Sequence, residues 1–211
     1  MHGPHGHLSP LGNRRAALVL GLRMLSGATG LGALLSACAS TSLPPPVIAA
    51  EAGSPTTPLL RLSPASFGGS LSLLQQLTVE TRGRTHRFDV VLEVDDEAVR
   101  LAVLNLGQTV ARLAWDGTHL VESRAAGWPA AVRGERVLSD LQLMLWPVAE
   151  IAAALPAGWT IAGDEALQRK LSQGAETVAT VRRVSSTVSE LDQLREAYRI
   201  HVESRPWGAS P

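Results

Sequence analysis

The sequence predicts a mostly β protein of the α+β class, in which a strongly curved antiparallel sheet forms an open half-barrel of about 8–11 strands around a helical plug. Two observations predict this fold. From residue 70 onward, apolar and polar residues alternate with period two, as expected for strands with one buried face. A single mostly apolar helical segment interrupts these strands, and it is the element available to cover that face.

The first segment, residues 1–37, is typical of a bacterial lipoprotein signal peptide. Arg14 and Arg15 form a positive start, an apolar run follows, and the tetrad LSAC at 35–38 resembles a lipobox. The resemblance implies that Cys38 becomes the first mature residue and carries acyl chains, palmitate among them, which would anchor it in a membrane. The alternative is that this cysteine is an ordinary buried thiol.

A Pro-rich tether is expected after the signal peptide, over residues 38–66. It holds six prolines, which cannot donate to a strand ladder and favour extended conformations. The residue after the cysteine is Ala39. In lipoproteins of Gram-negative bacteria an aspartate there retains the protein at the inner membrane, so the resemblance implies the outer membrane, with the domain facing the periplasm. The folded domain is expected over residues 67–204 and a flexible tail over 205–211.

Five meandering strands are expected first. The alternation predicts strands over 70–80, 84–95, 99–103, 110–115 and 119–123. Hairpin turns are expected between them at Arg82-Gly83, Asp95-Asp96, 105–107 and Asp116-Gly117. The last of these turns is the sharpest signal, because both of its residues accept the positive φ that a two-residue hairpin needs.

A helical pattern then begins at Leu138, is stopped or kinked at Pro147 and continues to Leu155. Three or four further strands are expected after it. Their period returns at Trp159, resumes over 177–181 and ends in a strand over 198–202.

The composition excludes some classes of protein. The formal net charge is zero, with 19 basic and 19 acidic residues, and three of the basic residues but none of the acidic ones lie in residues 1–37. The mature chain would therefore carry about −3, which gives no basic field for nucleic acid. A single cysteine allows no disulfide within the chain, so the fold must depend on packing.

No catalytic constellation is found in the sequence. It holds no G-x-S-x-G motif, and His86, His119 and His201 have no clustered ligand partners, so they are expected to be surface residues. The acidic run at 93–97 lacks the glycine-bearing calcium loop and is expected to be a solvated turn. We expect a protein that is not an enzyme, with no catalytic residues, no metal and no cofactor.

Several segments together resemble a known family: Gly83-Arg84 with Phe88, LEVD at 92–95, LGQ at 106–108, LAWDG at 113–117 and LSDLQLMLWP at 138–147. These resemble the DUF3261 family over roughly residues 67–204. Its members are bacterial lipoproteins whose genes often accompany aryl polyene biosynthesis. Their fold is similar to that of LolA and LolB, the lipoprotein carrier and its outer-membrane receptor.

The resemblance implies a half-barrel cavity for a lipid-like ligand, with a periplasmic LolA-like carrier as a partner. The alternative is a structural or assembly lipoprotein whose concave face binds a protein, and a lipid hydrolase is disfavoured. Leu106, in a hairpin turn, matches in position a leucine that helps the LolB-like receptor enter the membrane. The tryptophans of the cavity set could instead be simple core residues. The expected cavity residues are Leu73, Leu77, Val79, Phe88, Val90, Leu92, Leu101, Val103, Leu113, Trp115, Leu141, Leu145, Trp146 and Trp159.

Overall fold

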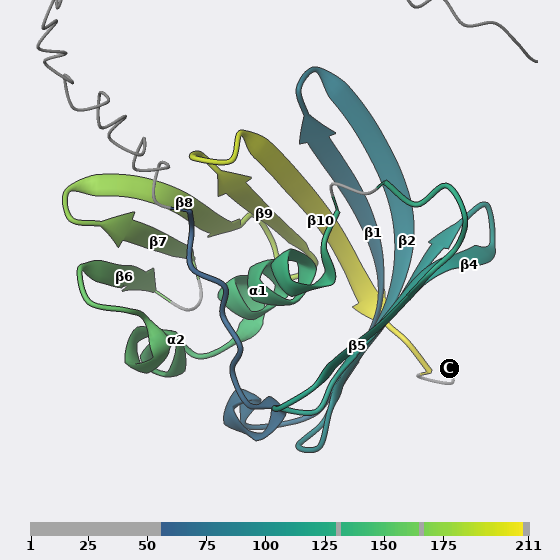
Figure 1. Ribbon diagram of the computed structural model, residues 1–211, viewed down its shortest axis with the longest axis horizontal. Helices are drawn as coiled ribbons and strands as arrows, with labels where there is room; N and C mark the ends of the chain where they lie inside the picture. The colour runs from purple at the N-terminus through teal and green to yellow at the C-terminus, as the bar shows by residue number, and fades with distance from the viewer. Residues whose placement is uncertain (1–55, 130–131, 165–166, 209–211) are drawn as a thin grey trace, which may run out of the picture. The chain divides into compact units, whose positions relative to one another are not determined.

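The computed structural model describes residues 56–129, 132–164 and 167–208. Within these residues, ten antiparallel strands form one curved, unclosed sheet in the order β5-β4-β3-β2-β1-β10-β9-β8-β7-β6 (Figure 1). The concave face of the sheet surrounds a helix, α1. The predicted fold class, a mostly β open half-barrel with a helical element, is confirmed. The predicted signal peptide and Cys38 lie outside the described residues.

The five N-terminal strands form one meander, as predicted, and a second group of strands follows the helices. The strands are β1 (Leu71–Thr81), β2 (Arg84–Val94), β3 (Val99–Asn105), β4 (Gln108–Trp115), β5 (Leu120–Arg124), β6 (Trp159–Asp164), β7 (Gln168–Gln173), β8 (Glu176–Arg183), β9 (Val188–Gln193) and β10 (Tyr198–Pro206).

The predicted hairpin turns are confirmed, and aspartates close two of them. The Asp116 carboxylate accepts hydrogen bonds from the backbone N–H groups of Thr118 and His119, at 2.7 and 2.6 Å. Gly117 has φ 93°, the left-handed conformation that favours glycine. Asp95 accepts two backbone N–H bonds in the same way in the β2–β3 turn. These side chains satisfy turn donors that the ladder leaves unpaired.

Two strands, β7 and β9, have no counterpart in the prediction. Each has a polar residue at one inward position beside a buried leucine, Leu171 in β7 and Leu191 in β9, so the apolar alternation that identifies a strand is too short. Arg169 and Gln193 are both buried on the concave face, where Arg169 lies opposite Val181 and Gln193 lies opposite Ala179. Both side chains form hydrogen bonds with α1. Strand periodicity cannot predict such contacts.

The helical region also differs in detail from the prediction. α1 (Gly134–Leu145) begins four residues before the predicted start at Leu138, and Pro147 separates it from the short α2 (Val148–Ala154). Proline cannot continue a helix because it lacks the backbone donor. α1 has a buried face, which includes Leu138 and Leu141, and it lies along the concave face of the sheet (Figure 1).

An extended segment before β1, residues 57–67, packs along α1, and we call it the strap. Leu60 and Leu62 are buried in the core with α1. The side chain of Gln142, fully buried, accepts from the Leu62 backbone N–H at 3.0 Å and donates to the Leu62 carbonyl at 2.9 Å. Ser139 Oγ accepts from the Leu60 N–H at 3.0 Å. Side chains of α1 therefore satisfy backbone groups of the strap that a neighbouring strand would otherwise satisfy.

The strap corrects the predicted extent of the tether. The prolines in residues 57–66 predict a tether, yet this part of the chain is buried against α1 and belongs to the folded body. Pro64 is buried at the start of a short 3-10 helix, Pro64–Phe67, where its missing N–H costs nothing. Apolar residues between the prolines, Leu60 and Leu62, were the available signal for burial.

Replacing the buried amide of the strap contact should destabilise the fold. In Gln142→Ala the Leu62 N–H loses its acceptor and a small cavity opens, so the free energy of unfolding should fall by about 2–4 kcal/mol. Urea denaturation followed by tryptophan fluorescence measures this change. The exposed Gln76→Ala on β1 is the matched control and should stay within about 0.5 kcal/mol of wild type. Equal midpoints for both variants would contradict the assigned role of the strap.

Candidate functional site

The residues predicted to line a cavity lie on the concave face and on the helix that covers it. The strand register brings them together: Leu92 pairs with Leu73 and with Leu101, and Leu101 pairs with Leu113. Trp159 lies in β6 at the far edge of the sheet. The predicted residues therefore share one surface.

These side chains pack against one another. Eight of the fourteen belong to the main hydrophobic cluster of the described residues, and four more, partly buried, pack against it. Leu73 and Val79 are half-buried. Strand residues at the centre, such as Leu92, are fully buried. Towards the end of the sheet where β1 meets β2, Leu77 and Phe88 are only partly buried. The apolar surface is thus continuous, covered at its centre by α1 and the strap and more accessible at one end.

Two predicted cavity tryptophans are core residues bound to the strap. Trp146, with no exposed surface, donates from its indole N–H to the Ser63 carbonyl at 3.2 Å, and its ring centroid lies 5.1 Å from that of Phe67. Trp115 donates to the Leu62 carbonyl at 2.8 Å. Buried indole N–H groups need such partners.

A buried carboxyl group joins α1 to the C-terminal strands. Asp140 is 5% exposed, and its two oxygens accept from the Tyr198 hydroxyl at 2.5 Å and the Gln193 amide at 2.7 Å. Burial raises the pKa of Asp140 to about 6, because a desolvated carboxylate is unfavourable even when two donors face it. The pKa of Tyr198 is also raised, first by burial and then by the Asp140 charge.

Two arginines extend these polar contacts along the helix. Arg136 on α1 pairs with Glu196 of the β9–β10 turn at 2.7 Å and donates to the Thr57 carbonyl of the strap at 2.9 Å. The buried Arg169 donates to the carbonyls of Leu143 and Trp146, at 2.9 and 2.7 Å, where the end of α1 leaves carbonyls unpaired. The helix is therefore held to the sheet by polar contacts as well as by apolar packing.

Sequence reasoning missed Asp140, Arg136 and Arg169 as partners across elements. Within the helical pattern Asp140 reads as a polar residue near a helix start, which gives no sign of burial. The available signal was indirect: Asp140 lies between the buried Leu138 and Leu141, on the apolar side of the helix.

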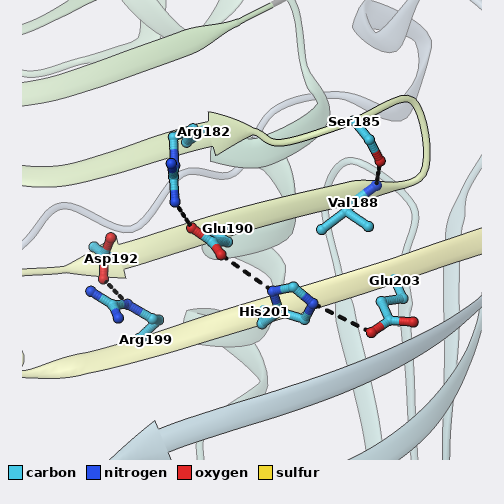
Figure 2. A network of polar contacts seen from close by, with 8 residues as sticks. All are labelled: Arg182, Ser185, Val188, Glu190, Asp192, Arg199, His201 and Glu203. Carbon is cyan, nitrogen blue, oxygen red and sulfur yellow. Dashed lines mark hydrogen bonds and ion pairs between the residues drawn. The ribbon is translucent and has the colours of Figure 1, made fainter.

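The outer face of the sheet carries a separate polar network. His201 lies between two carboxylates, its Nδ1 3.4 Å from Glu190 and its Nε2 3.4 Å from Glu203 (Figure 2). Glu190 also accepts from Arg182, and this bond lowers the pKa of Glu190. Among the described residues, His, Cys, Asp and Glu form no group of three that could hold a metal ion. The network joins β8, β9 and β10 across the solvated face.

Two other predicted features are exposed turns. Leu106 is 96% exposed at the tip of the β3–β4 turn, with φ 50°. The acidic run after β2 is a solvated turn, as expected, where Asp95 also pairs with Arg100 at 2.6 Å and a hydrogen bond from that arginine lowers the pKa of Asp95.

The comparisons with known proteins place this fold in a family. A family model described as a protein of unknown function, DUF3261, matches residues 72–206, more than half of the chain. The chain belongs to the DUF3261 family. The DUF3261 match runs from the start of β1 to the end of β10, so it covers the whole sheet and both helices but not the strap. No curated protein matched the sequence.

Neither of the two helices described in this DUF3261 protein has the length and hydropathy needed to cross a bilayer.

The raised pKa of Asp140 should make the stability of the fold depend on pH. The folded protein binds this proton more tightly than the unfolded chain, whose value is 3.8, so the free energy of unfolding should fall as pH rises from about 4 to about 6. Relative to Asp140→Asn, which does not titrate there, wild type should lose up to about 3 kcal/mol over that range. Urea midpoints at half-unit pH steps measure the difference. The exposed Asp96→Asn controls for general charge effects, and parallel curves for wild type and Asp140→Asn would contradict the assignment.

Proposed function

We propose that this protein is an outer-membrane lipoprotein, anchored through acyl chains on Cys38, that binds a lipid-like ligand on its concave face. The ligand would be lipoprotein acyl chains or an aryl polyene lipid, delivered to the outer membrane, and a periplasmic LolA-like carrier would supply it. The chain would act by binding and not as an enzyme. Ligand entry requires α1 to move, because α1 and the strap cover the apolar surface.

The observation that carries the proposal is the one-sided apolar sheet. Its concave face is continuous across β1–β4 and β10, and its cover is a helix and an extended strap instead of a second sheet. A helix of twelve residues is a small element beside ten strands. Lipid chains that replaced it on the sheet would restore apolar contact with the same side chains, so the exchange conserves most of the buried apolar area.

The polar contacts of α1 support such an exchange. Asp140 and Arg136 are held by partners on β9, β10 and the β9–β10 turn, and each of these contacts can be replaced by water when the helix leaves. Exchanging such a hydrogen bond for one to water costs little net free energy, so these contacts add little to the cost of moving the helix. The raised pKa of Asp140 also weakens its attachment at neutral pH, where the buried carboxyl must ionise.

Leu106 supports delivery at a membrane surface. An isolated leucine with 96% exposure and positive φ makes no contribution to the core, and positive φ is unfavourable for a residue with this side chain. Insertion into a bilayer would bury it. Eighteen residues separate Cys38 from Thr57, enough chain to span up to about 60 Å from the anchor.

A structural or assembly role is the second candidate. The close packing of twelve of the fourteen predicted cavity residues favours it, since a filled concave face needs no ligand. The edge strands β5 and β6 each have one neighbour in the sheet and could add a strand from a protein partner. Lipids that co-purify with the protein would discriminate between the two functions.

A charge at the accessible end of the concave face should prevent ligand binding. In Phe88→Glu the half-buried aromatic ring is replaced by a carboxylate, so co-purifying lipid measured by mass spectrometry should fall at least tenfold. Leu74→Glu places the same charge on the opposite face of β1 and should keep the lipid content of wild type. Wild-type protein that carries no lipid would contradict the proposal and favour the assembly role.

Leu106 should contribute to membrane association. In a Cys38→Ser background, which removes the proposed anchor, Leu106→Asp should reduce co-sedimentation with liposomes several-fold, because the leucine no longer inserts. Val184→Asp changes an exposed residue in the β8–β9 turn, at the opposite end of the strands, and serves as the control. Equal losses in both variants would show that Leu106 has no special role.

A further inference from the structure

At one end of the sheet, three turns contain a non-glycine residue with positive φ. Three non-glycine residues of the described chain have positive φ, namely Arg82, Leu106 and Ala197. They lie in the β1–β2, β3–β4 and β9–β10 turns, which the antiparallel order places at the same end of the sheet. Strained backbone at several turns of one end points to a functional surface.

Between two of these turns lies an open hollow of about 450 Å³. We call it the rim hollow; Arg82, Gly83 and Arg84 line one side of it, and Ala197 and Tyr198 line the other. Arg82 has φ 48° and Gly83 has φ 73°, which is the geometry of a two-residue turn that prefers asparagine and glycine. An arginine in the first position is therefore unfavourable, and no hydrogen bond or ion pair to another described residue offsets this cost.

The arginines of the rim hollow differ in their partners. Arg199 is bound to Asp192 at 2.5 Å. Arg82 and Arg84 are exposed, and neither forms an ion pair with any described residue. With Glu80 also present, three arginines face two carboxylates, so the lining carries net positive charge. Two guanidinium groups are left to bind an anion from outside.

Apolar surface begins beyond His86, which lies between Arg84 and Phe88 on the same face of β2 and stacks on Phe88 with the ring centroids 6.3 Å apart. On the same face of β1, Val79 pairs with His86 and Leu77 pairs with Phe88. Phe88, Leu77 and Val79 are half-buried, so the concave face is more accessible here than at its centre. A ligand that bridges the two regions must have an anionic end and an apolar body.

We propose that the rim hollow binds the anionic headgroup of the ligand through Arg82 and Arg84, while its apolar chain lies along Val79, Leu77 and Phe88. This inference rests on the proposed lipid-binding function and assigns the ligand class: an amphiphile with net negative charge, such as a phosphodiester lipid. Neutral and zwitterionic lipids of equal chain length bind more weakly, because they offer the two guanidinium groups no net charge.

Matched short-chain lipids below their micelle concentrations test the proposal. Calorimetry with the full chain should give about tenfold tighter binding for dihexanoyl-phosphatidylglycerol than for dihexanoyl-phosphatidylcholine. The Arg82→Gln/Arg84→Gln variant should lose this preference and keep the weaker binding of both lipids. Glutamine retains the Cβ atom, so the turn strain is unchanged. Arg112→Gln, an exposed arginine on the outer face of β4, is the matched control and should keep the preference.

The other outcomes distinguish a failure of the headgroup assignment from a failure of the proposed lipid binding. Equal binding of both lipids by wild type overturns the headgroup assignment and leaves lipid binding intact. Binding of neither lipid overturns both. Inorganic phosphate is the third probe. If phosphate binds as tightly as phosphatidylglycerol and the double variant abolishes its binding, the hollow is a site for a free anion. That result would overturn the assignment of an amphiphilic ligand.

Discussion

The structure depends on how a one-sided sheet is covered. Ten strands present a continuous apolar face, and no second sheet lies against it in the described residues. One helix and one extended strap must therefore exclude water from the concave face. The strap is attached to the helix by hydrogen bonds between the backbone of Leu60 and Leu62 and the side chains of Ser139 and Gln142.

Polar groups on the concave face fix where the helix lies. Apolar packing alone would allow α1 to shift along the sheet, because its leucines would bury similar areas at several positions. Asp140 has its two donors on β9 and β10, and Arg169 on β7 reaches the last carbonyls of α1. These contacts specify one register and one direction for the helix. The inward polar residues of β7 and β9 are thus the complement of α1, and they account for the weak apolar alternation in those strands.

Local sequence patterns predicted what depends on neighbours in the chain. The first five strands follow from alternation, and the turn at Asp116-Gly117 follows from the conformations that these residues accept. The strap and the Asp140 contacts join residues 53 to 83 positions apart, so no local period encodes them. The predicted cavity residues were grouped correctly on one surface, but the sequence could not show that α1 and the strap cover that surface so closely.

The two ends of the sheet are covered to different extents, which sets a direction for access. At one end the 3-10 helix of the strap packs against the β4–β5 turn, where a Cβ atom on Gly117 would lie 3.3 Å from the ring of Pro64. At the other end the turns of β1–β2, β3–β4 and β9–β10 project with positive φ at Arg82, Leu106 and Ala197. The strap begins at this second end, since Arg136 joins Thr57 to Glu196 of the β9–β10 turn. The proposed ligand would therefore meet the least packed side chains of the concave face at the end of the sheet where Thr57 lies.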